Sequence, residues 1–293
     1  MRSKATSLRF LPRQPARSVL SGRHASRLRG RGLNFEELRD YLPGDDVRTI
    51  DWKVTARTGT PYVRVYTEER DRPALLLVDQ RMSMFFGSRL NMKSVTAAEA
   101  AALAAFRILD QGDRVGGIVF GDQTIAEFRP QRAGRAVNRL ISAISTANQM
   151  LRADVPPAPV LPLNEPLAAA ARIAKKDHLV IVFSDFDEID DQTEALVRRL
   201  AMTNDVILFA ITDPISRVLP EGLKLVVSDG DLQAEIDTRS GNVRSALADM
   251  TSGRLAQVLD WSKRFDVPVL PLSAGEPTLP QIQHLLGHKR SVQ

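Results

Sequence analysis

Two aspartates at the ends of apolar runs are the residues of this chain best suited to chemistry. Asp79 closes the run 74–78 and opens the loop sequence DQRMS, and Asp185 follows the run 178–183. If both runs are parallel strands of one sheet, the two carboxylates lie on the same rim, at the carboxyl ends of the strands. Magnesium prefers oxygen ligands and keeps several waters, so two carboxylates and the hydroxyl of Ser83 would suffice to bind it. The pattern therefore predicts a possible magnesium site.

The loop DQRMS departs from the metal-binding signature Asp-x-Ser-x-Ser because Arg81 stands where the first serine belongs. Two carboxylates about 4 Å apart repel each other by roughly 4 kcal/mol at an effective dielectric constant of 20. Either a divalent cation or the guanidinium of Arg81, through paired hydrogen bonds, would offset this repulsion. Two interpretations stay open, a metal-free site filled by arginine and a weak or intact Mg²⁺ site. A third is that both acids only cap helices.

The rest of the chain beyond residue 72 alternates apolar runs with segments of helical periodicity. This rhythm predicts an α/β fold with a doubly wound, mostly parallel sheet. The expected strands are 74–78, 114–120, 123–128, 178–183, 205–210 and 267–270, and the expected helices are 92–109, 133–147, 167–174, 190–202, 242–264 and 280–287. A hairpin of 224–227 and 234–237 is expected at the sheet edge, and the proline-rich segment 154–166 is expected to be a loop. Lys93 and Ser94 end a segment that falls one glycine short of a phosphate-binding loop, so we expect them to open a helix.

Composition favours a cytoplasmic protein with a substantial core. The chain has 293 residues, 43% of them apolar, and no cysteine, which excludes disulfides and thiolate metal sites. No apolar stretch approaches the roughly 20 residues of a membrane span. Nine basic residues and no acidic one precede Glu36, so we expect 1–29 to be a basic flexible tail. Because aromatic residues are not interleaved there, we expect no nucleic-acid partner, and nucleic-acid binding through 1–31 stays the weaker alternative.

The segment 30–72 is expected to be a separate hairpin-containing, charged extension, followed by the main domain at 73–293. The extension mixes turn sequences with charged and aromatic side chains, namely Tyr41, Asp45, Asp46, Arg48, Asp51 and Trp52. Mixed charges of this kind usually pair with one another on a solvated surface. Aromatic residues and arginine are also enriched at interface centres, so these six residues are an equally good candidate for a partner-binding face.

Several blocks of the chain resemble the bacterial family called domain of unknown function 58 (DUF58). They are GRGLNFEELRDYLPGDDVRTIDWKVTAR, VRVYTEERDRPALLLVDQRMSMFFGS, KSVTAAEAAALAAFRILDQGDRVGGIVF, LVIVFSDFDE and the segments ITDPISRVLPEG and EIDTRSGNVRSAL. Together they extend over about residues 22–275, and YLPGDDVRTIDW is the most specific of them. The resemblance implies a von Willebrand factor type A fold of Rossmann-like architecture with an N-terminal β-rich extension.

The resemblance also implies a function. Members of this family are linked with MoxR-type AAA+ ATPases and are regarded as adaptors without enzyme activity, and other von Willebrand factor A proteins are further possible partners. The adhesion site of type A domains, carried over by position, would use Asp79, Ser83 and Asp185 as metal ligands. Arg81 replaces the first serine and Glu165 the threonine, and an Arg81–Glu165 pair would close the site, so any Mg²⁺ would bind weakly.

Two hypotheses of different classes follow. The first is a non-enzymatic adaptor with a degenerate metal site that docks a MoxR-type ATPase through a rim of Asp79, Arg81, Ser83, Glu165 and Asp185, and helps to assemble or mature a client. The second is a Mg²⁺-dependent hydrolase or phosphotransferase that uses Asp79 and Asp185. Ser83 is the only nucleophile at hand for that chemistry.

Overall fold

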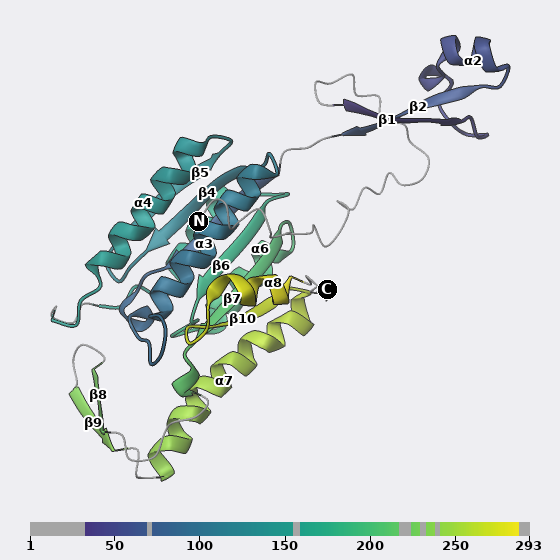
Figure 1. Cartoon of the computed structure of the whole chain (residues 1–293). Helices are drawn as coiled ribbons and strands as arrows, with labels where there is room; N and C mark the ends of the chain where they lie inside the picture. Colours follow the sequence, from purple (N-terminus) through teal and green to yellow (C-terminus); the bar gives the residue numbers. More distant parts are fainter. Residues whose placement is uncertain are drawn as a thin grey trace, which may run out of the picture. The chain divides into compact units, whose positions relative to one another are not determined.

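The computed structural model describes residues 33–68, 72–154, 159–216, 224–228, 233–237 and 241–286. The chain divides just before Arg72 into a small N-terminal unit and a large unit (Figure 1). The expected basic tail, 1–29, lies outside the described residues, so its interpretation stays a prediction.

The large unit is built on a six-stranded sheet in the order β10-β7-β6-β3-β4-β5. Its neighbouring strands are parallel except at one edge, where β5 runs antiparallel to β4. This confirms the predicted doubly wound, mostly parallel sheet. The strands are β3 (Pro73–Asp79), β4 (Arg114–Phe120), β5 (Ile125–Gln131), β6 (Leu179–Ser184), β7 (Asp205–Thr212) and β10 (Val269–Ser273).

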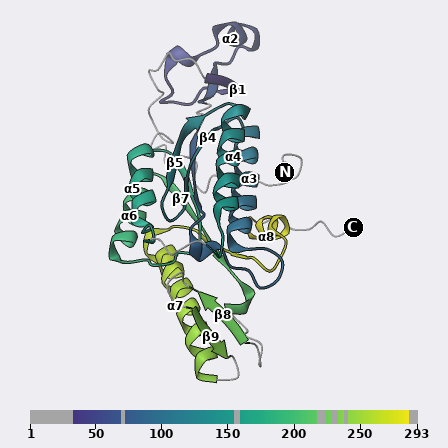
Figure 2. The ribbon, with the colours of Figure 1, turned by 90° about the vertical axis from the view of Figure 1, so that its left-hand side faces the viewer.

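Helices cover both faces of this sheet (Figure 2). One core joins the sheet to α3 (Lys93–Asp110), α4 (Gly134–Met150) and α8 (Thr278–Leu285). The other joins it to α5 (Asn164–Ile173), α6 (Asp191–Ala201) and the later part of α7 (Gly241–Phe265). Because the central strands are buried on both faces, they are almost continuously apolar, as in the sequence LLLV of β3.

Two expected elements differ in the structure. Helix α5 begins at Asn164, inside the expected loop 154–166, because a proline is tolerated in a first helical turn whose backbone N–H groups have no intrahelical partner. The predicted hairpin forms as β8 (Lys224–Ser228) and β9 (Gln233–Asp237), but as a separate two-stranded sheet and not at the edge of the main one. Strand periodicity cannot specify which sheet a hairpin joins.

The order of the strands creates a switch point between β3 and β6. The chain leaves β3 toward β4 on one side of it and leaves β6 toward β7 on the other. In open α/β sheets the ligand-binding crevice lies outside the carboxyl ends of the strands at such a point. Asp79 is the last residue of β3, and Asp185 directly follows β6.

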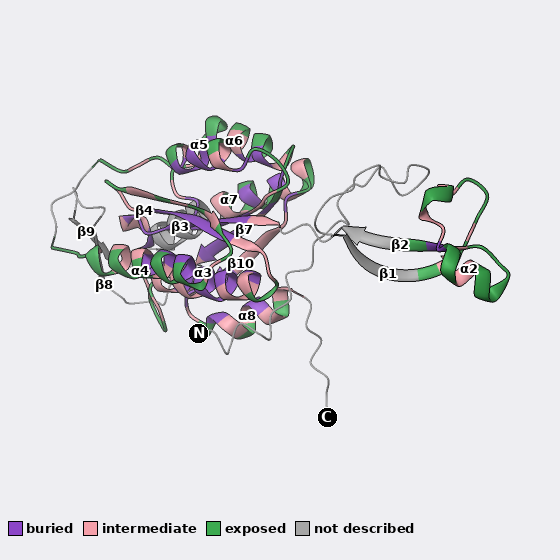
Figure 3. Ribbon diagram, turned by 90° about the horizontal axis from the view of Figure 1, so that it is seen from above, coloured by how far each residue is buried: buried purple, intermediate pink, exposed green. Residues whose placement is uncertain are grey.

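The small unit pairs β1 (Leu33–Asp40) with β2 (Tyr62–Glu68) in an antiparallel ribbon, with a bulge at Phe35 and Glu37. Between the strands lie the 3₁₀ turn η1 (Val47–Thr49) and α2 (Trp52–Thr58). Most of its described side chains are exposed or half-buried (Figure 3). The sequence predicted this β-rich extension.

None of the helices formed by the described residues is long and apolar enough to cross a lipid bilayer.

Strand β4 depends on a glycine at position 116. A Cβ atom there would lie 2.3 Å from the carbonyl oxygen of Phe128 and 2.5 Å from the backbone nitrogen of Pro130 in β5. We expect Gly116→Ala to lower the free energy of unfolding by about 2 kcal/mol, because backbone atoms cannot move aside as a side chain can. Urea denaturation would measure the loss. Gly134→Ala is the matched control, since nothing lies within 4 Å of a Cβ at that position; equal unfolding midpoints for the two variants would contradict the prediction.

Candidate functional site

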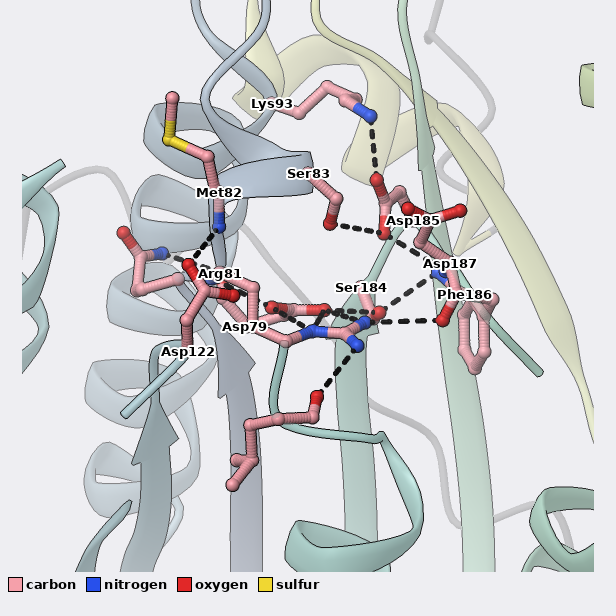
Figure 4. A network of polar contacts seen from close by, with 12 residues as sticks. Asp79, Arg81, Met82, Ser83, Lys93, Asp122, Ser184, Asp185, Phe186 and Asp187 are labelled. Carbon is pink, nitrogen blue, oxygen red and sulfur yellow. Dashed lines mark hydrogen bonds and ion pairs between the residues drawn. The ribbon is translucent and has the colours of Figure 1, made fainter. Parts of the chain in front are cut away.

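The centre of the switch point holds a fully buried ion pair between Asp79 and Arg81 (Figure 4). The Nη2 atom of Arg81 lies 2.9 Å from Oδ2 of Asp79, and its Nε lies 3.1 Å from Oδ1. The backbone N–H of Arg81 also donates to Oδ1, over 3.0 Å. Neither side chain has measurable exposure. The two residues are only two positions apart, so the loop turns back and places its guanidinium against the carboxylate that opens it.

Arg81 also joins the two neighbouring rim loops. Its Nη1 donates to the carbonyl oxygen of Leu161 over 3.1 Å, and its Nη2 lies 3.5 Å from that of Asp187. The guanidinium carbon lies 5.8 Å from the ring centroid of Phe120, at the end of β4. One side chain thus contacts the loop before α5, the loop after β6 and the neighbouring strand.

Asp185 has its own cation, which is Lys93. The ammonium Nζ lies 2.6 Å from Oδ2 of Asp185, while Ser83 Oγ and the backbone N–H of Asp187 donate to Oδ1 over 3.3 and 3.1 Å. Lys93 is the first residue of α3, so the expectation that it opens a helix is confirmed. Its contact with Asp185, 92 positions away, was not anticipated from the sequence.

The protonation equilibria follow from burial and these cations. Burial raises the pKa of Asp79, and the charge of Arg81 counteracts that rise. Burial alone would lower the pKa of Arg81, but Asp79 raises it above the ordinary value, so the guanidinium stays charged. For Asp185, burial would raise the pKa, but Lys93 and then Arg81 bring it below the ordinary value. Two acids and two bases therefore form a locally neutral cluster.

A divalent cation does not fit the residues present. The oxygens it would need on Asp79 and Asp185 already accept charge-assisted hydrogen bonds from Arg81 and Lys93, and Arg81 fills the position of the missing serine. Within the described ranges, no group of three or more acidic, histidine or cysteine residues could hold a metal ion. Of the three interpretations that the sequence left open, this geometry favours the arginine-filled site.

Ser184 and a strained backbone hold Asp79 in place from the β6 side. Ser184 Oγ donates to Oδ2 of Asp79 over 2.6 Å and accepts from the backbone N–H of Phe186 over 2.9 Å. Phe186 has a φ of 56°, in the left-handed region that non-glycine residues rarely adopt. Its ring packs edge-on against Trp261 of α7, with the centroids 6.3 Å apart. Residues with strained backbone conformations cluster at functional sites, so Phe186 marks this rim as a candidate site.

The structure changes the roles of several predicted rim residues. Asp79 and Arg81 are fully buried, so they shape the rim from below and do not offer atoms to a partner. Glu165 is exposed in the first turn of α5, and the expected Arg81–Glu165 pair is wrong, because Arg81 reaches Asp79, two positions away, from inside the core. Ser83 is half-buried at the surface of the rim.

Asp122 was also missed. It follows β4, its Oδ2 accepts the backbone N–H of Met82 over 2.9 Å, and burial raises its pKa. The sequence did contain an indication of this role: Asp122 follows the strand 114–120, and a residue after a strand parallel to β3 lies on the same rim.

The acidic residues of the predicted partner-binding face in the small unit have internal roles. Asp45 pairs with Arg39, and Asp51 with Arg64, while Asp46 caps η1. Tyr41 is half-buried, and Arg48 and Trp52 are exposed. The structure thus realises the self-paired surface for Asp45 and Asp51, and the exposed residues remain candidates for binding.

This arrangement defines a class: a doubly wound α/β domain whose carboxyl-end rim carries protein cations beside its two aspartates. Solved structures similar to it include the conserved hypothetical protein BatB from Bacteroides thetaiotaomicron (11% identity, TM-score 0.43, 73% of this chain and 95% of that one) and the SpRpn10 VWA domain (11% identity, TM-score 0.41, 76% and 100%).

The chain belongs to the family described as "Protein of unknown function DUF58", which matches residues 37–255. Among its relatives, uncharacterized proteins of Mycobacterium tuberculosis (strain H37Rv) and Mycobacterium bovis are each 30% identical over 229 residues, which is 77% of this chain and 69% of theirs. The resemblance noted in the sequence is thereby confirmed at the level of the family.

Replacing the buried guanidinium should open the site to metal. We expect Arg81→Ser to lower the free energy of unfolding by about 3–5 kcal/mol, because it leaves Asp79 buried without a cation. Millimolar Mg²⁺ or Mn²⁺ should then restore part of the loss, whereas the wild type should show no shift in melting temperature. Arg81→Met is the matched control, since it removes the charge without supplying an oxygen ligand. Equal metal responses in the wild type and Arg81→Ser would contradict the prediction.

The Lys93–Asp185 contact should make stability depend on pH in a defined direction. Because the pKa of Asp185 is lowered, its stabilising contribution is present above the pKa of the unfolded chain and is lost as pH falls through the folded value. Lys93→Met should cost about 3 kcal/mol near pH 7. The difference in stability between the wild type and Lys93→Met should become smaller toward about pH 4, because the carboxyl group of Asp185, left without its cation in the variant, then becomes protonated and neutral.

Urea denaturation at both pH values measures this difference. Lys175→Met, which removes an exposed lysine, serves as the control and should change stability little at either pH. A Lys93→Met deficit that is constant with pH would show that the ammonium does not act on the charge of Asp185.

Proposed function

We propose that this chain is a non-enzymatic interaction protein that binds a partner at the carboxyl-end rim of its sheet without a metal ion. The observation that carries the proposal is the occupation of both rim carboxylates by protein cations, Arg81 on Asp79 and Lys93 on Asp185. A tethered cation supplies the charge balance that a metal would bring, and it leaves no open coordination position for chemistry. The rim is then a preformed docking surface.

This rim exposes several large apolar side chains. The loop between β3 and α3 exposes Phe86, Leu90 and Met92 by 38%, 55% and 36% respectively. Hydrogen bonds hold this loop in place, from the backbone N–H of Lys93 to Phe86 and from that of Asn91 to Ala274. A fixed loop with several large apolar side chains loses little conformational entropy on binding. Ser83 and Glu165 lie on the same rim and complete the candidate surface.

The partner that the family resemblance suggests is a MoxR-type AAA+ ATPase, with this chain acting as an adaptor in the assembly or maturation of a client. Other von Willebrand factor A proteins are further candidates for binding. We place this activity in the cytoplasm, and we assign the rim to a main domain that starts at residue 73 and follows a separate extension, 30–72.

The alternative, a Mg²⁺-dependent hydrolase or phosphotransferase, has less support. Its metal would have to displace Arg81 and Lys93 from two carboxylates that they already neutralise. Its nucleophile, Ser83, donates a hydrogen bond to Asp185. Asp185 is a weak base for activating that hydroxyl, because its ion pair with Lys93 lowers its pKa.

Charging the apolar rim loop should weaken binding to the partner. We expect Leu90→Asp to reduce the affinity for a MoxR-type ATPase of the same organism at least about 10-fold, because the aspartate would have to be desolvated at the contact. Biolayer interferometry with the full chain would measure it. Met202→Asp is the matched control, since Met202 is 78% exposed at the end of α6, away from the carboxyl-end rim. Unchanged affinity for Leu90→Asp would contradict rim docking.

A further inference from the structure

The small N-terminal unit carries, in one short segment, an exposed tryptophan and three cations that form no ion pair with the residues the structure describes. We propose that its segment 42–57 binds an acidic, partly apolar segment of a partner protein, with Trp52 as the anchor. This inference rests on the proposed function as an interaction protein, but it concerns a different surface from the rim and fixes the chemistry of the partner.

The first step is that internal partners already occupy two of the carboxylates in this segment. Asp45 accepts two hydrogen bonds from the guanidinium of Arg39, over 2.7 and 2.8 Å, and one from the backbone N–H of Leu42. Asp51 caps α2 by accepting from the backbone N–H of Lys53 and binds Arg64 Nε over 2.8 Å. These carboxylates are therefore structural, and a cationic partner would have to break internal pairs to reach them.

The second step is the charge that remains. Arg48, Lys53 and Arg57 are exposed, and none of them forms an ion pair with any residue that the structure describes. Lys53 and Arg57 lie four positions apart on α2, which contains no acidic residue. Positions four apart lie on one side of a helix. The unpaired charge of the segment is positive, so the complementary partner is acidic.

The third step is the apolar anchor. Trp52 is 67% exposed, and the nearby Leu42 and Val47 are 59% and 57% exposed. Large apolar side chains gathered in one short segment mark an interaction site, and tryptophan dominates binding energies where it is buried by a partner. The two Arg–Asp pairs and the capped helix fix the backbone that carries these side chains, so the surface is ordered before it binds.

A protein segment explains this combination better than a nucleic acid does. Proteins that bind single-stranded nucleic acid commonly use several exposed aromatic rings on which successive bases stack. In the described part of the small unit, Trp52 is exposed, whereas Tyr41 and Tyr62 are half-buried.

The test uses the full chain and synthetic peptides. The probe is a fluorescein-labelled helical peptide of about 20 residues with leucine on one face and glutamate on the other, and its matched form has lysine in place of glutamate. Fluorescence anisotropy gives the affinity. Unlabelled peptide should also shift the tryptophan emission to shorter wavelength, because Trp52 is exposed whereas Trp261, the other tryptophan of the chain, is fully buried.

The expected result is that the glutamate peptide binds and the lysine peptide does not. Trp52→Ala should weaken binding about 10-fold or more. The double variant K53E/R57E should weaken it comparably, with a reduced dependence on salt. K175E/K176E makes the same change of charge at two exposed lysines of the large unit and should bind as the wild type does.

Three results would overturn the inference: equal binding of both peptides, wild-type affinity in Trp52→Ala, or wild-type affinity in K53E/R57E. Binding to phosphatidylserine vesicles that Trp52→Ala abolishes, without peptide binding, would assign the surface to a membrane and also reject it. If Trp52→Ala retains peptide affinity while Leu90→Asp loses the ATPase, this inference fails and the proposed function stands.

Discussion

A single buried ion pair, Arg81 on Asp79, determines how the carboxyl end of this sheet is built. A carboxylate without exposure needs a compensating charge, and the loop that follows β3 supplies one from two residues away. The same guanidinium reaches the carbonyl groups of Leu161 and Asp187, so the loops before α5 and after β6 are fixed to the strand that carries the acid. Lys93 neutralises Asp185 in the same way. Removing one partner of such a pair costs more than the pair itself contributes, because the remaining charge stays buried.

The sequence predicts the sheet well because its physical causes are local. The strands of the main sheet are apolar runs bounded by turn residues, and Asp79 at the end of one of them identifies the rim without any knowledge of distant contacts. The site itself is only half predictable. Arg81 is visible within the loop, but the contact of Lys93 joins residues 92 positions apart, and nothing near Lys93 in the sequence indicates it. The expected Arg81–Glu165 pair is wrong for a different reason: position in a motif does not determine the direction of a side chain, and Arg81 turns toward Asp79.

In the small unit, the charge that the surface presents to a partner depends on which acidic side chains are paired internally. Its segment 42–57 contains three acidic and three basic residues, which suggests a mixed, self-neutralising face. The structure pairs Asp45 with Arg39 and Asp51 with Arg64, and it uses Asp46 as the cap of η1. Arg48, Lys53 and Arg57 stay exposed in the same segment as Trp52. What a partner would meet there is therefore opposite in sign to what the acidic motif PGDD suggests.

The tethered guanidinium has one more consequence. A bound ion comes and goes with its concentration in the cell, but an arginine side chain is always present at its carboxylate. The neutral, closed state of this rim is therefore permanent, and changes in cellular magnesium have no ligand set here on which to act. In the proposed function, the timing of binding and release at this surface therefore originates in the docking partner.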